Sequence, residues 1–413
     1  MRRRLGILTL ILITALPVSA RAYGNETKQA AGRTISLDLG YIPPLGTNRS
    51  MHNLWLEYEY VGTNLFDLVS DKTFIGGNFL TRTIWSVADF SLWYILGDTG
   101  FFIANHEFGH GTRCIADNST PTFTWTGGGS HTSIITFALE GFLHAGHSSS
   151  AFTSCSGGGV SGTFPTGWAV VGSAGGMNNS MMFAETLEDE VYYNTGHLLE
   201  LAPYLHAKTD AFYYGRSKST TNNDVTSITG TWQSLGYNIT AQNVSQGGLV
   251  SFLADPYTYA FVWGLFRYIG TGDPNITAPK IGRFALPGLS FFENRNGLSY
   301  RLRTAYDTGS TSYPVSLEYV YQGKPTVEAS FGIRHSEPIG NVRKTGSMIQ
   351  GYINSELGLG LRAMKDFRAG SHSFFDLEGS IFTAQSLEGE RNMGHMLFNP
   401  VGIEVAARYS IIY

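Results

Sequence analysis

The chain has 413 residues, enough for more than one structural unit, and its formal net charge of −4 offers no broad basic surface. That charge argues against a nucleic-acid-binding protein. Charged residues make up only 15% of the sequence while aromatic residues reach 13%, a poor match to an ordinary soluble enzyme, in which about a quarter of the residues are charged.

The first 22 residues have the features of a secretory signal peptide. Arginines occupy positions 2–4, residues 5–16 are apolar, and Ala-Arg-Ala at 20–22 offers a cleavage site with small residues on both sides. A retained membrane anchor would need a longer apolar run. We therefore expect residues 1–22 to be removed and the protein to be exported.

Two segments near the mature N-terminus alternate apolar and polar residues with a period of two. They are residues 33–42 (RTISLDLGYI) and 53–62 (NLWLEYEYVG). Alternation over segments of this length is typical of β-strands with one apolar face. We predict N-terminal barrel strands within residues 23–64.

Residues 65–275 lose this alternation and are predicted to form a mainly helical unit, with one further strand expected at 226–240. Its apolar stretches, such as 247–270, are broken by charged residues. None is the unbroken run of about 18 apolar residues typical of a transmembrane helix. The helices are therefore expected to pack within the protein or against the mouth of a barrel.

The helical unit contains an H-E-x-x-H motif made by His106, Glu107 and His110. Histidines four apart on a helix share one face and can bind one metal ion, while Glu107 can accept a proton from water that the metal activates. The neighbouring residues are mostly apolar, and burying such polar groups is costly unless they are paired or bind a metal. The motif predicts a Zn²⁺ site; the alternative is a helix with two surface histidines.

A catalytic zinc site needs a third protein ligand and one open position. Glu185 and Asp189 form an E-x-x-x-D pair on a segment with helical character. Together with H-E-x-x-H, this pair resembles the gluzincin metallopeptidases. The resemblance implies that Glu185 binds zinc and that Asp189 orients one of the two histidines; Asp189 and His197 are alternative ligands. A solvated acidic helix face is the alternative reading of the whole segment.

Two other sets of residues enter the hypothesis. His197 and Tyr192 follow Glu185 closely, and either could stabilise a developing oxyanion. The site-two intramembrane proteases also have H-E-x-x-H in apolar helices, with an aspartate in an L-D-G context as third ligand. That triplet is absent here, and Asp255 is a poor substitute, so this family is the weaker resemblance.

From residue 276 to 413 the period of two returns over segments of about ten residues separated by turn residues. In 314–321, for example, Val315, Leu317, Tyr319 and Tyr321 share a face. A soluble sandwich also alternates, but long strands, abundant tyrosine and a terminal aromatic residue resemble bacterial outer-membrane barrels. The predicted fold is α+β: an antiparallel membrane β-barrel of roughly eight to ten strands with a mainly helical, metallopeptidase-like insertion.

The two cysteines, Cys114 and Cys155, could pair in an oxidising compartment, but spacing alone leaves a reduced, buried pair open. The leading hypothesis is a zinc metallopeptidase of the outer membrane, with a peptide or protein substrate and membrane lipid as partners. The alternatives are a non-catalytic structural or transport barrel with a helical plug, and a metal hydrolase acting on a non-peptide substrate.

Overall fold

The computed structural model describes residues 34–38, 48–72, 78–93, 99–117, 119–143, 150–156, 168–217, 223–339, 342–383, 385–392, 395–398 and 401–412. The predicted signal peptide lies outside these residues. The helices are α2 (Asn48–Lys72), α3 (Phe79–Trp93), α4 (Thr99–Ala116), α5 (Ile134–Leu143), α6 (Trp168–Ser173), α7 (Gly175–Tyr193), the short 3₁₀ helix η5 (Leu198–Glu200), α8 (Leu201–Arg216), α9 (Asp224–Ser234), α10 (Ala241–Ala254), α11 (Pro256–Thr271) and α12 (Leu387–Asn392).

The strands divide into a large C-terminal set and a few short ones. The short strands are β1 (Thr34–Asp38), β2 (Thr120–Trp125), β3 (Ser130–His131), β4 (Ala151–Ser156), β5 (Gly196–His197), β6 (Asn275–Ile276), β7 (Lys280–Ile281), β8 (Phe284–Ala285) and β16 (His395–Phe398). The longer ones are β9 (Gly288–Asn294), β10 (Gly297–Asp307), β11 (Thr311–Gly323), β12 (Val327–Ile339), β13 (Val342–Asn354), β14 (Leu359–Arg368), β15 (Ser373–Thr383) and β17 (Val401–Ile412). The predicted α+β composition is confirmed.

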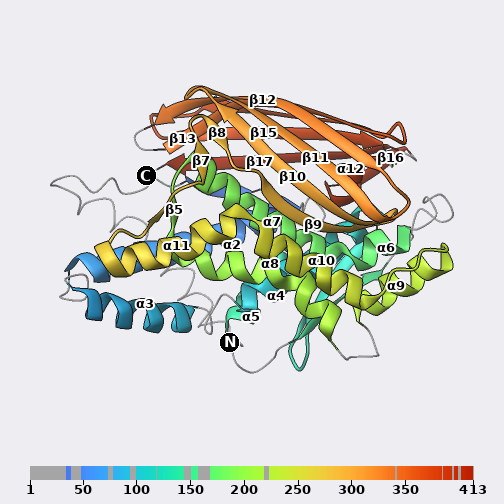
Figure 1. The fold of residues 1–413 in the computed structure, drawn as a ribbon, viewed down its shortest axis with the longest axis horizontal. Coiled ribbons are helices and arrows are strands. Elements are labelled where there is room, and N and C mark those ends of the chain that lie inside the picture. The colour runs from blue at the N-terminus through green and yellow to red at the C-terminus, as the bar shows by residue number, and fades with distance from the viewer. Residues whose placement is uncertain are drawn as a thin grey trace.

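One large antiparallel sheet covers the helices (Figure 1). Its hydrogen-bonded order is β1-β17-β15-β14-β13-β12-β11-β10-β8-β7, with β16 paired to β17 and β9 paired to β10. The N-terminal strand β1 pairs with the C-terminal strand β17, with Thr34 opposite Ile412 and Asp38 opposite Arg408. The order starts at β1 and ends at β7, and in the described residues these two end strands do not pair with each other. The described strands therefore form a large antiparallel sheet that is not closed into a barrel.

The two faces of the sheet differ in polarity. On β11, Val315, Leu317 and Tyr319 are between 41% and 49% exposed, whereas the intervening Glu318 is 1% exposed. The other long strands repeat this arrangement, with apolar residues outward and carboxylates, serines and arginines inward. The inner face packs toward α7 and α12 (Figure 1).

Two segments predicted as strands are helical. Residues 53–62 lie within α2, where Met51, Trp55 and Glu59 are fully buried. Residues i and i+4 lie on the same face in a strand and also in a helix. Over a short segment, the same apolar pattern is therefore compatible with either structure. The length of α2, 25 residues, decides for the helix.

The strand predicted at 226–240 is also wrong, because residues 224–234 form α9. The Asn223 side chain accepts a hydrogen bond from the Val225 amide and caps the helix. Val225, Ile228 and Trp232 are buried at the spacing of one helical face.

The helical part of the chain has a conventional apolar core. Phe183 of α7 is fully buried and stacks on Trp55 of α2, with ring centroids 4.1 Å apart. None of the helices in the described part of the chain is long and apolar enough to cross a membrane.

Cys114 at the end of α4 and Cys155 of β4 form a disulfide with their Cα atoms 5.6 Å apart, so the paired alternative holds. Disulfides are typical of proteins outside the cytoplasm.

Candidate metal centre

Helix α4, which carries the H-E-x-x-H motif, crosses α7 at glycines. A Cβ added at Gly109 would lie 2.1 Å from the Gly175 carbonyl oxygen, and one added at Gly176 would lie 2.3 Å from Nε2 of His106. Both are closer than real Cβ atoms approach a neighbour, so any larger side chain would push the helices apart. The glycines therefore let the His106 ring lie directly against α7.

The two motif histidines converge on an aspartate of another helix. His106 Nε2 lies 3.0 Å and His110 Nε2 lies 3.3 Å from Oδ2 of Asp224, the first residue of α9. The ligand atoms of His106, His110 and Asp224 all lie within 4.8 Å of one another. In the described part of the chain, no other group of three or more His, Cys, Asp or Glu side chains is found this close together. The buried His106/His110/Asp224 group could hold a metal ion.

The opposite ring nitrogens are held by acceptors. Nδ1 of His106 donates to Asp210 Oδ2 on α8, and Nδ1 of His110 donates to the Gly172 carbonyl oxygen on α6, both at 2.9 Å. A proton on Nδ1 leaves a lone pair on Nε2, the nitrogen that faces Asp224. Metal-binding histidines usually donate their second ring N–H to a carboxylate or carbonyl in this way.

The distances suit a small tetrahedral ion. Zinc binds imidazole nitrogen and carboxylate oxygen at about 2.0–2.2 Å, which places neighbouring ligand atoms roughly 3.3–3.5 Å apart. The two Nε2–Oδ2 separations of 3.0 and 3.3 Å are close to that edge length. Two imidazoles and one carboxylate also match a catalytic zinc site, which keeps its fourth position open.

The site concentrates negative charge around the imidazoles. Burial lowers the pKa of His106, but Tyr214, Asp210 and Asp224 outweigh it and hold that pKa well above its ordinary value. Burial likewise opposes charge on His110, and Asp224 raises its pKa. Burial raises the pKa of Asp224, yet His110 and His106 lower it overall. The neighbouring carboxylates thus favour positive charge on the two imidazole rings.

Glu107 and Tyr214 border this group. The Thr153 hydroxyl on β4 lies 2.7 Å from Oε2 of Glu107 and can donate to it. Its single proton can go instead to the Glu107 carbonyl oxygen, at 2.9 Å. The Tyr214 ring stacks on His106, with centroids 4.6 Å apart and planes at 14°. Interaction with His106 lowers the pKa of this tyrosine, but burial and Asp210 raise it overall to about 12, so its hydroxyl keeps its proton.

Glu185, the ligand implied by the gluzincin resemblance, is held elsewhere. It lies on α7 facing the sheet, where Arg301 Nε and Arg303 Nε each lie 3.0 Å from its Oε1 and Arg301 also binds Oε2. Asp189, 51% exposed, pairs with Arg303 Nη1 at 3.1 Å. The structure does not bring either side chain into the group formed by His106 and His110.

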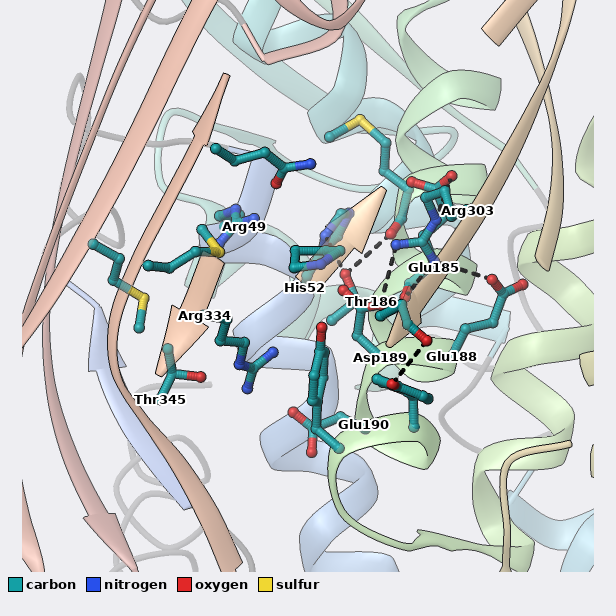
Figure 2. Close-up of a pocket in the computed structure, with 18 of the residues that line it drawn as sticks. Arg49, His52, Glu185, Thr186, Glu188, Asp189, Glu190, Arg303, Arg334 and Thr345 are labelled. Carbon is teal, nitrogen blue, oxygen red and sulfur yellow. Dashed lines mark hydrogen bonds and ion pairs between the residues drawn. The ribbon is translucent and has the colours of Figure 1, made fainter. Parts of the chain in front are cut away.

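These acidic residues line a separate cavity of about 320 Å³ between α7 and the inner face of the sheet. Figure 2 shows Glu185, Glu188 and Asp189 around Arg303, with Arg334 of β12 facing the same space. Carboxylates already bound by arginines are poorly placed to bind a metal as well. The E-x-x-x-D pair here joins the helices to the sheet.

The remaining candidates also lie away from the histidine pair's group. The Tyr192 hydroxyl donates to the Ala305 carbonyl oxygen on β10, at 3.2 Å. His197 caps η5, accepting from the Leu199 amide, and its Nε2 lies 3.2 Å from Asp67. Asp255 is fully buried, pairs with Lys208 and caps α11. Their positions suit roles in holding the fold.

The sequence analysis did not identify three residues of the candidate site: Asp224, Asp210 and Tyr214. Asp224 is 118 residues from His106 and lies just before residues 226–240, for which the sequence predicts a strand. The available signal was the Asn223-Asp224 pair before an apolar helical pattern, which is typical of a helix start. That signal predicts the helix but not its meeting with α4.

The fold and the site together define a mixed α+β protein with a candidate metal centre in its helical part and a large antiparallel sheet beside it. No family model, no curated protein and no solved structure matches the chain.

Proposed function

We propose that the protein is a zinc-dependent hydrolase of the outer membrane that cleaves peptide bonds. The observation that carries the proposal is the convergence of two imidazole Nε2 atoms and one carboxylate oxygen, with both Nδ1 atoms held by acceptors. Zinc bound there would lower the pKa of a coordinated water and polarise a substrate carbonyl oxygen.

The chain's own residues would supply proton transfer and charge stabilisation. Glu107, next to His106 on α4, would take a proton from the attacking water and return it to the leaving nitrogen. Thr153 orients the Glu107 carboxylate through its hydroxyl. Tyr214, protonated and stacked on His106, replaces His197 and Tyr192 as the candidate donor to the developing oxyanion.

A peptide substrate is favoured by the strand next to the motif. β4 pairs with β2 on one side, and in the described residues no strand pairs with its other side. Thr153 of β4 reaches Glu107, so this strand lies beside the H-E-x-x-H motif. An extended peptide can add to such an edge through backbone hydrogen bonds.

The membrane location is favoured by the sheet. Its outward face exposes large apolar side chains on successive long strands, whereas its inward face is polar, which is the arrangement of a membrane sheet rather than a water-soluble one. The predicted signal sequence and the disulfide agree with export.

The test is zinc content after purification in detergent and dialysis, for the wild type, Asp224→Ala and Glu185→Gln. We expect about one zinc per chain in the wild type and in Glu185→Gln, and little in Asp224→Ala, because three ligands are needed for stable binding. Loss in Glu185→Gln with retention in Asp224→Ala would restore the gluzincin ligand set. A folded wild type that takes up no added zinc contradicts the proposal and leaves a barrel-like sheet with a helical plug.

Substrate class is tested separately, with the zinc-loaded protein. Hydrolysis of a peptide library is expected; hydrolysis of acyl esters or cell-wall fragments without peptide cleavage would favour the non-peptide hydrolase.

A further inference from the structure

Helices α10 and α11 expose apolar side chains on the face that points away from the protein. On α11, Tyr259, Trp263 and Phe266 are 59–66% exposed and share one helical face; on α10, Val250 and Leu253 are 47% and 53% exposed. Soluble helices turn such a face toward the core. In Figure 1 the two helices run beneath the sheet, beside β9 and β10.

The side that α10 buries is made of small residues. Its buried positions are Val244, Ser245, Gly247, Gly248 and Ser251. A Cβ added at Gly247 would lie 2.1 Å from the Phe291 ring on β9, and one added at Gly248 would lie 2.8 Å from the backbone of α8. Small residues inside and large apolar residues outside are typical of helices that pack in lipid.

Charge is scarce along the pair. Asp255 and Arg267 are the charged residues between 241 and 271. Asp255 is fully buried against Lys208, and Arg267 pairs with Asp273 and with the Asn275 carbonyl oxygen. Apart from Gln242 and Gln246 in the first half of α10, the large exposed side chains of the pair are therefore apolar, and the two charged residues are paired.

The two helices also pack against β9, the strand at one edge of the sheet. β9 pairs with β10, and in the described residues no strand pairs with its other edge. α10 packs on β9 through Gly247 and Phe291, and Tyr257 of α11 lies against Gly288. An uncovered strand edge is not tolerated in lipid, because its backbone groups find no hydrogen-bond partners there.

We propose that α10 and α11 take the place of barrel strands at this edge of the sheet, with their exposed face against the acyl chains of the bilayer. This inference rests on the membrane location proposed above.

A groove beside α11 extends the same surface. It has a volume of about 480 Å³, and Tyr259, Trp263, Ile276, Pro279 and Leu286 are among the residues that line it. The groove suits an acyl chain lying along the helix, since its walls are largely apolar.

The test uses nitroxide spin labels on the full chain in phosphatidylethanolamine–phosphatidylglycerol vesicles. The native cysteines are paired, so single cysteines can be labelled at Trp263→Cys and Phe266→Cys on α11. Val405→Cys, on the outer face of β17, is the reference for a label in lipid. Gln233→Cys, at an exposed position of α9, is the reference for a label in water. Collisions with O₂, which dissolves in lipid, are compared with those of a water-soluble nickel chelate.

We expect O₂ collisions to exceed nickel collisions at positions 263, 266 and 405, and the reverse at 233. Two α11 positions keep the test informative if one variant does not fold. If the label at 405 is exposed to lipid but the labels at 263 and 266 are exposed to water, this inference is wrong. The proposed membrane location of the sheet is then still supported. A water-exposed label at 405 overturns both. Spectral broadening at 263 that disappears on dilution with unlabelled protein would show that a second copy covers the face instead.

Discussion

The core of the helical part is mainly apolar, whereas the inner face of the sheet is mainly polar and charged. In the helical part, Trp55, Phe183 and Phe261 are fully buried. On the sheet, Phe331 and Val405 are 56% and 61% exposed. The sheet instead buries charge, as in the Arg391–Glu318 pair. The sheet thus exposes the kind of side chain that the core of the helical part buries.

Burial of a charged side chain therefore does not by itself mark a functional site. Buried charged residues of the sheet pair with charges on the elements beside them, as Glu318 of β11 does with Arg391 of α12, while the histidines of α4 converge with a carboxylate around a common point. We expect chemistry to reside in the helical part and to be insensitive to the sheet's charges.

Removing the negative charge of Glu107 tests whether the chemistry resides in the helical part. Glu107→Gln should lower turnover about 10²–10⁴-fold, the usual contribution of general acid–base catalysis, while zinc content stays at the wild-type level. The matched change is Glu337→Gln at an exposed position of β12, which should leave turnover unchanged. Equal losses in both variants would erase the distinction between the two parts.

The second effect concerns stability. Phe183→Ala opens a cavity in the helical core and should cost about 3–5 kcal/mol of unfolding free energy. Phe331→Ala, at an outward position of the sheet, should cost less than about 1 kcal/mol. Urea unfolding in detergent micelles, followed by circular dichroism, measures both. A costlier Phe331→Ala would mean that the outward face is packed against protein.

A third, smaller effect probes the support of the histidines. Asp210→Asn keeps the shape of the side chain but removes the charge that accepts from His106 Nδ1. We expect zinc affinity to fall about 10–100-fold, as for other partners of metal-binding histidines. Competition with a fluorescent chelator measures it. Unchanged affinity would remove Asp210 from the site.

The smallest effect lies at β4. Thr153→Val removes the hydroxyl that can donate to Glu107 and should lower turnover roughly fivefold, corresponding to about 1 kcal/mol for one hydrogen bond. Thr153→Ser should restore it. If serine fails to restore turnover, the methyl group of Thr153 matters rather than its hydroxyl.

The sequence specified the two parts unevenly. The sheet strands were predictable because each alternates over about ten residues, and the pairing of β1 with β17 followed from the ends of the chain having the same pattern. α2 was missed because Leu54, Leu56 and Tyr58 satisfy a strand pattern and are also partly buried helix positions.

In the candidate site, His106, Glu107 and His110 were visible because they lie within one helical turn and a half. Asp224, Asp210 and Tyr214 come from α9 and α8, and only tertiary packing brings them to α4. Glu185 had the right residue type and spacing, but Arg301 and Arg303, more than a hundred residues further along, bind its carboxylate.

The disulfide gives the chain a covalent ring. Cys114 and Cys155 are 41 residues apart, and the ring between them contains β2, β3, α5 and β4. A single backbone cut inside it, by the protein itself or by another protease, leaves both fragments joined. Such a nicked molecule would run as one full-length species on a denaturing gel and would separate into two only after a thiol is added.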